Sequence, residues 1–137
     1  MENKGDNEMM ELVHNVLQNS DISAAELKYL LECRDKGTID FTLIDIREMF
    51  EYTQLSIKGC DLLLPTSTIH TCMEALQKRK SNFLIFYCRT GNRTAQMLHI
   101  LKRMGFSKIA HLGRGIVDFK GEKLKNAPLP LNITCKG

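Results

Sequence analysis

The order of apolar and polar residues along the chain switches between helix-like and strand-like patterns. Residues 8–18 (EMMELVHNVLQ) place apolar side chains every three or four positions, which predicts an amphipathic helix. A short strand is expected at 22–23. Ser23 and Glu26 then have the spacing of a helix-capping box, and the helix that they begin is expected to end at 36–37. Four short apolar runs predict further strands, at 41–46, 61–65, 83–87 and 108–112.

Helical patterns separate these strands. We expect a helical turn at 48–52, a helix at 69–80 and a helix at 94–104 that Gly105 ends. A turn at 113–115 leads into a short helix through Phe119, and residues 124–137 have the composition of an extended tail. Strands that alternate with helices predict an α/β fold, with a central, mostly parallel sheet of about five strands and helices on both faces.

The length of 137 residues fits one domain with a single modest core. We divide the chain into an N-terminal helical extension (1–19), the domain proper (20–130) and a C-terminal tail (131–137). The first helix has an apolar stripe that can pack on the domain or on a second copy of the chain. The sequence therefore leaves open whether the protein is a monomer or a homodimer.

Composition and charge narrow the class of protein. No apolar run is long enough to span a bilayer, and the polar N-terminus lacks the pattern of a signal peptide, so we expect a cytoplasmic protein without a membrane partner. The net charge of +3 is too small to indicate nucleic-acid binding. Residues 1–51 are neutral to acidic, and the positive surplus lies in 78–125. That distribution favours a small anionic substrate or an acidic partner surface.

The cysteines and histidines do not form a metal-binding pattern. The five cysteines are an odd number and include no CxxC pair, so we expect neither a disulfide framework nor a zinc site. Cys60 and Cys72 are expected to be packing thiols. The four histidines, among them His111, have no metal-ligand spacing and are expected to be surface or packed residues.

Cys88 has a different environment, in the stretch FYCRTGNRTAQ (86–96). It directly follows the most apolar predicted strand and precedes a helix, and sites in parallel sheets form at the carboxyl ends of strands. The loop can curl because Gly91 tolerates backbone conformations that other residues avoid. Its backbone N–H groups, the helix dipole and the two arginines would all favour a thiolate. The candidate site consists of Cys88 as the nucleophile and the loop residues Arg89, Thr90, Gly91, Asn92 and Arg93.

A thiolate in such a loop can attack phosphorus, sulfur or a disulfide. Phosphatases of the phosphotyrosine type have five residues between the cysteine and the arginine, whereas four separate Cys88 from Arg93. The shorter loop makes a smaller bowl, which suits sulfur better than phosphate. The absence of CxxC argues against dithiol exchange.

Other charged residues near the site have structural alternatives. Asp45 and Arg47, at the end of the strand 41–46, are expected to form a scaffold by bidentate hydrogen bonds, and Arg47 has the helical spacing to pair with Glu51. Arg93 either ties the loop down, binds substrate, or does both. Arg89 either binds substrate or is merely solvated.

Three motifs in order resemble the single-domain rhodaneses, a family of sulfurtransferases. They are YCRTGNRTA around Cys88, LIDIREMFEY upstream, and KRMGFSKIAHLGRGIVDF downstream. The resemblance covers roughly residues 20–130 and implies the rhodanese three-layer fold. It also implies a ping-pong reaction, in which Cys88 takes a sulfane sulfur from a donor such as thiosulfate and a thiol or cyanide removes it from the persulfide. No metal or organic cofactor is implied.

The chain departs from the family pattern outside the loop. Leu55-Ser56-Ile57 replaces the usual Gly-His-Ile, Arg114 replaces the first glycine of a pair, and Phe119 replaces a tryptophan. Arg114 is a candidate third cation near the pocket. Cys135, in the tail, is a candidate to resolve the persulfide.

Two rival functions remain at this stage. One is a persulfide carrier or docking module that passes sulfur to a partner protein. The other, less favoured, is a relative of phosphatases or arsenate reductases.

Overall fold

The computed structural model describes residues 4–130, and its elements follow the expected alternation of strands and helices. The helices are α1 (Lys4–Asn19), α2 (Ala24–Asp35), α3 (Met49–Gln54), α4 (Met73–Gln77) and α5 (Asn92–Arg103), with 3-10 turns η1 (Ile69–Cys72) and η2 (Ile116–Asp118). The strands are β1 (Asp21–Ile22), β2 (Thr42–Asp45), β3 (Ser56–Ile57), β4 (Leu62–Leu63), β5 (Leu84–Tyr87), β6 (Ile109–Leu112) and β7 (Lys123–Leu124).

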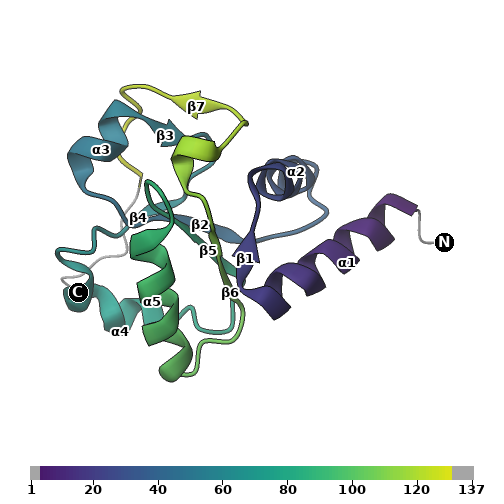
Figure 1. Ribbon diagram of the computed structural model, residues 1–137, viewed down its shortest axis with the longest axis horizontal. Coiled ribbons are helices and arrows are strands. Elements are labelled where there is room, and N and C mark those ends of the chain that lie inside the picture. The colour runs from purple at the N-terminus through teal and green to yellow at the C-terminus, as the bar shows by residue number, and fades with distance from the viewer. Residues whose placement is uncertain (1–3, 131–137) are drawn as a thin grey trace.

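Five of the strands form one parallel sheet in the order β1-β6-β5-β2-β4. Helices α1 and α2 pack on one face, and α4 and α5 cover the other (Figure 1). The predicted three-layer α/β fold is therefore confirmed. Because all these strands are parallel, their carboxyl ends lie at the same edge of the sheet.

The position of β5 in the middle of the sheet explains why its sequence is apolar at every position. All four of its residues are buried. Ile85 and Tyr87 belong to the core on the α1/α2 side, whereas Leu84 and Phe86 belong to the core on the α4/α5 side. Successive side chains of a strand point to opposite faces, so a strand covered on both faces needs an apolar residue at each position. Cys88 continues this alternation and joins the α4/α5 core.

Several predicted boundaries are confirmed closely. Ser23 and Glu26 form the expected capping box, in which each side chain accepts a hydrogen bond from the other residue's backbone N–H. Gly105 follows the last residues of α5 with a φ of +92°, the left-handed conformation expected after a helix. Helix α1 begins earlier than predicted, at Lys4, because backbone hydrogen bonds continue a helix into the polar residues that precede its first apolar position. Met9 and Val16 of α1 are buried in the domain core.

Two predictions were wrong in detail. The expected helix at 69–80 is instead η1 followed by the short α4, with turns at 78–80. Its first residues include β-branched side chains, and the hydroxyl of Thr71 donates to the carbonyl of Thr68, which competes with regular helix formation. The expected tail from residue 124 is also not extended throughout, because Asn126 has a φ of +56° and its backbone N–H donates to the carbonyl of Thr53. Leu124 lies in β7, which pairs antiparallel with β3 and closes a small second sheet beside α3 (Figure 1). Residues 131–137, with Cys135, lie outside the described residues.

The state of the cysteines corrects one further expectation. Cys33, Cys60 and Cys88 are free thiols. Cys72, which we expected to be a packing thiol, is disulfide-bonded.

Candidate active site

The loop from Cys88 to Arg93 connects the carboxyl end of β5 to the amino end of α5. The sulfur of Cys88 lies at the floor of this loop, and the residue is only 1% exposed. The backbone N–H of Gly91 donates to the sulfur, at 3.1 Å. Gly91 is the N-cap of α5 and has a φ of +96°, so the loop turns back toward the cysteine before the helix begins. The sulfur therefore lies at the amino end of α5 with a backbone N–H directed at it.

The glycine-rich turn 113–115 holds the loop from the other side. The backbone N–H groups of Ile116 and Val117 donate to the carbonyls of Cys88 and Arg89, at 2.9 and 3.2 Å. A Cβ atom on Gly91 would lie 2.0 Å from the carbonyl oxygen of Gly113, and one on Gly115 would lie 2.1 Å from that of Arg89. The two segments therefore pack backbone against backbone, and this approach requires glycine at both positions.

Arg93 is tied to α3 by a bidentate ion pair. Its two terminal nitrogens donate to the two carboxylate oxygens of Glu51, at 3.1 and 3.0 Å. This pairing lowers the pKa of Glu51 below its ordinary value of 4.5, chiefly through the hydrogen bonds from Arg93. The expected pair between Arg47 and Glu51 is therefore not the one formed. Arg93 therefore ties the loop to α3, which is one of the two roles predicted for it.

The pairing with Glu51 predicts an acid-sensitive contribution to stability. A carboxylate whose pKa is lower in the folded than in the unfolded protein stabilises the fold at neutral pH, and this stabilisation is lost as the pH falls through the folded pKa. The melting temperature of the wild type should fall more between about pH 7 and about pH 3 than that of Glu51→Gln. Glu48→Gln is the control, because Glu48 contacts Ser67 instead and its variant should keep the wild-type acid sensitivity. Parallel pH profiles for the wild type and Glu51→Gln would contradict the prediction.

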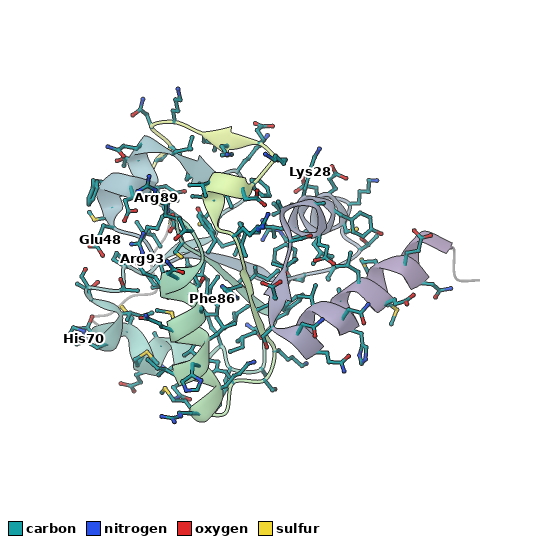
Figure 2. The ribbon with its side chains drawn as sticks, in the orientation of Figure 1. Lys28, Glu48, His70, Phe86, Arg89 and Arg93 are labelled. Carbon is teal, nitrogen blue, oxygen red and sulfur yellow. The ribbon has the colours of Figure 1, made fainter. Side chains whose placement is uncertain are left out.

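Arg89 is the exposed cation of the loop. No carboxylate of the described residues pairs with it. It lies with Arg93 between α3 and the start of α5 (Figure 2). It also lines a cavity of about 550 Å³, together with Arg47, Phe50, Glu51, Gln54, Leu55, Ile116 and Val117. An unpaired guanidinium beside this cavity can attract an anion.

Asp45 and Arg47 form a buried pair behind the loop. The guanidinium of Arg47 donates to both carboxylate oxygens of Asp45, and its Nη2 also donates to the carbonyl of Leu55, at 2.6 Å. Burial raises the pKa of Asp45, and the hydrogen bonds from Arg47 oppose that shift. The pair connects the end of β2 to the segment after α3, so its position fits a scaffold.

Sequence reasoning missed two residues that the fold brings to the cysteine. The hydroxyl of Thr94 lies 3.6 Å from the sulfur of Cys88 and 2.6 Å from Nδ1 of His111. Thr94 is fully buried, although its place directly after Arg93 was visible in the sequence. The signal for His111 was its position as the one polar residue within the apolar stretch IAHL (109–112).

Other candidate residues lie away from the sulfur. Arg114 is exposed and lines a separate cavity with Asp21, Ser23 and Asp118, so the structure does not place it beside Arg89. Burial raises the pKa of Cys60 to about 12. That thiol therefore stays protonated at neutral pH.

In the part of the chain that the structure describes, no group of three or more histidine, cysteine, aspartate or glutamate residues could hold a metal ion. Among residues 4–130, no helix is long and apolar enough to cross a bilayer.

The family model of the rhodanese-like domain matches residues 23–122. The chain therefore belongs to the rhodanese-like domain family, a family of sulfurtransferases. It is 33% identical over 100 residues to the probable adenylyltransferase/sulfurtransferase MoeZ of Mycobacterium tuberculosis. This match covers 73% of the present chain and 24% of MoeZ. It is also 26% identical over 119 residues to a tRNA uridine(34) hydroxylase of Enterobacter. That match covers 84% of the present chain and 32% of the hydroxylase. The chain thus spans about a third or less of the length of these relatives.

Solved structures show the same fold. A rhodanese-related protein from Thermoplasma volcanium has a TM-score of 0.62 and 23% identity, with 76% of this chain and 96% of that chain covered. A rhodanese with anions from E. coli has a TM-score of 0.53 and 23% identity, with 63% of this chain and 99% of that chain covered. A thiosulfate sulfurtransferase from Pseudomonas aeruginosa has a TM-score of 0.64 and 19% identity, with 78% and 20% covered.

Proposed function

We propose that the protein is a sulfurtransferase that carries sulfur on Cys88. The observation that supports this most directly is the Cys88 sulfur at the floor of a short cationic loop, with the Gly91 N–H donating to it at 3.1 Å. Four residues between the cysteine and Arg93 give a bowl sized for sulfur. Membership in a sulfurtransferase family agrees with this chemistry.

The proposed reaction has two half-reactions. The Cys88 thiolate attacks the outer sulfur of an anionic donor such as thiosulfate, the S–S bond of the donor breaks, and sulfite leaves with the bonding electron pair. The enzyme then holds a persulfide, whose terminal negative charge the loop N–H groups and Arg89 stabilise. An acceptor thiolate, or cyanide in vitro, attacks the outer sulfur, and the Cys88 thiolate leaves. No electron has to come from a cofactor.

Intact-mass measurement of the wild-type protein tests the first half-reaction. After incubation with thiosulfate we expect a mass increase of one sulfur atom, which peptide mapping assigns to Cys88. Addition of a thiol acceptor or cyanide should remove it. Absence of the adduct with thiosulfate and with an organic persulfide donor would reject the proposal. If no sulfur adduct forms and the protein instead hydrolyses a generic aryl phosphate, that result would favour the phosphatase alternative.

Arg89→Ala should weaken the use of an anionic donor. Because Arg89 is exposed and unpaired beside the cavity, we expect its loss to raise the KM for thiosulfate about tenfold, with a smaller effect on kcat. Arg114→Ala is the matched control, since it removes an equal charge from a different cavity and should leave the KM unchanged. Equal effects of the two substitutions would show that only the overall charge matters.

A persulfide carrier that serves a partner protein is the second candidate. Phe50 is 64% exposed and Val117 is 56% exposed, and both line the cavity beside Arg89. Exposed apolar side chains at the mouth of a site favour contact with a larger acceptor. The two candidates differ in turnover. A carrier would load one sulfur but turn over slowly with a small donor and acceptor, whereas an independent enzyme would complete many turnovers with them in the steady state.

A further inference from the structure

A chain of polar contacts leads from Cys88 across the α5–β6 interface. The Thr94 hydroxyl lies 3.6 Å from the Cys88 sulfur and 2.6 Å from Nδ1 of His111. On the far side of the imidazole, Nε2 lies 3.8 Å from a carboxylate oxygen of Asp21. These residues come from α5, β6 and β1, so the contacts exist only in the folded protein.

The Thr94 hydroxyl has one hydrogen and three acceptors within reach. The acceptors are the carbonyl of Gly91 at 3.1 Å, Nδ1 of His111 and the Cys88 sulfur. The shortest of these contacts is the one to His111. When the imidazole is neutral and accepts this hydrogen, the hydroxyl cannot donate to the sulfur. When Nδ1 carries a proton it becomes the donor, and the hydroxyl hydrogen is released for the sulfur.

The surroundings of His111 determine which nitrogen is free to accept. Asp21 on β1 faces Nε2, which favours a hydrogen on that nitrogen and leaves Nδ1 as the acceptor. Burial lowers the pKa of His111 from its ordinary 6.5, Lys102 on α5 adds to this shift, and Asp21 opposes it. The buried side chains that α1 contributes to this core, Met9 and Val16, are apolar. At neutral pH the imidazole is therefore a neutral base whose charged form Asp21 stabilises.

We propose that His111 takes up the proton of Cys88 through the hydroxyl of Thr94 as the sulfur attacks. The thiol proton of Cys88 passes to the Thr94 oxygen as the hydroxyl proton passes to Nδ1 of His111. The sulfur forms its new bond as it loses the proton, which leaves a Thr94 hydroxyl and an imidazolium whose Nε2–H faces Asp21. One proton moves along the chain and no redox step is involved. His111 is thus a positioning residue that acts through Thr94, and its role rests on the proposed use of Cys88 as a nucleophile.

The rate at which iodoacetamide alkylates Cys88 tests this directly, since the sulfur must lose its proton to react. His111→Asn keeps an amide that can bond to the Thr94 hydroxyl but cannot take a proton. We expect alkylation at neutral pH to be about tenfold slower than in the wild type, with the difference disappearing at high pH, where hydroxide removes the proton without the imidazole. His99→Asn is the control, because His99 is exposed on α5, and it should behave as the wild type.

Threonine variants test the route. Thr94→Val removes the hydroxyl and should slow alkylation as much as His111→Asn, whereas Thr94→Ser keeps it and should restore the wild-type profile. The double variant His111→Asn/Thr94→Val should be no slower than either single one, because both interrupt the same chain. Asp21→Asn leaves the imidazole in place and should slow alkylation about threefold. If His111→Asn folds poorly, Asp21→Asn still tests whether the imidazole acts on Cys88.

Two results would overturn the inference. One is a wild-type pH–rate profile in folded His111→Asn and in Asp21→Asn. The other is independent, multiplying effects of the His111 and Thr94 substitutions. Alkylation needs no sulfur donor, so failure of thiosulfate loading would reject the proposed function and leave this result standing.

Discussion

Cys88→Ser is expected to lose all sulfur loading from thiosulfate while keeping the wild-type fold. The serine oxygen can still accept the hydrogen bond that the Gly91 N–H donates to the sulfur, so the free energy of unfolding should change by no more than about 1 kcal/mol. A serine hydroxyl stays protonated at neutral pH and is a far weaker nucleophile than a cysteine thiol. Intact mass after thiosulfate treatment and steady-state transfer to cyanide measure the loss.

Cys60→Ser is the matched control for this prediction. The Cys60 thiol points at the carbonyls of Leu43 and Leu62, which a serine hydroxyl can replace as a donor. Because burial raises the pKa of this thiol to about 12, it contributes no nucleophile at neutral pH. Cys60→Ser should load and transfer sulfur as the wild type does. A sulfur adduct that persists in Cys88→Ser would place the acceptor thiol elsewhere in the chain.

Gly115→Ala is expected to destabilise the protein and disable the loop together. Gly115 has a φ of +73°, which an alanine adopts only with strain, and the new Cβ would lie 2.1 Å from the Arg89 carbonyl oxygen. Strain and displacement together should lower the free energy of unfolding by at least about 2 kcal/mol. Because the Arg89 peptide must move, sulfur transfer should fall by about a hundredfold. Denaturant unfolding and kcat/KM with thiosulfate measure the two effects.

Gly37→Ala separates backbone strain from the contact with the loop. Gly37 has a similar φ of +78°, but a Cβ there would meet no atom within 4 Å. It should cost about 1 kcal/mol of stability and leave sulfur transfer unchanged. If Gly115→Ala is no more harmful than Gly37→Ala, the close packing of the turn against the loop is not important for the site.

The sequence predicted the elements whose burial or helix capping is visible in a short run of residues. The run FLIFY is apolar at every position because β5 is buried on both faces, and the capping box at Ser23 depends only on residues three apart. The sequence could not predict β3 and β7, because neither lies in an apolar run and each becomes a strand only by pairing with the other, which is distant in the sequence. It also overestimated the helix at 69–80, where side-chain hydrogen bonds favour a 3-10 turn.

For the candidate site, the sequence by itself identified the proposed nucleophile, Cys88, and its loop. Cys88, Gly91 and Arg93 lie within six residues, between a strand and a helix, and local geometry is enough to bring them together. Only the tertiary structure decided their partners. Glu51 meets Arg93 from 42 positions away, His111 meets Thr94 from 17, and Gly115 packs on the Arg89 carbonyl. These contacts depend on the order β1-β6-β5-β2-β4 and on the position of α3 beside the amino end of α5, which no local pattern encodes.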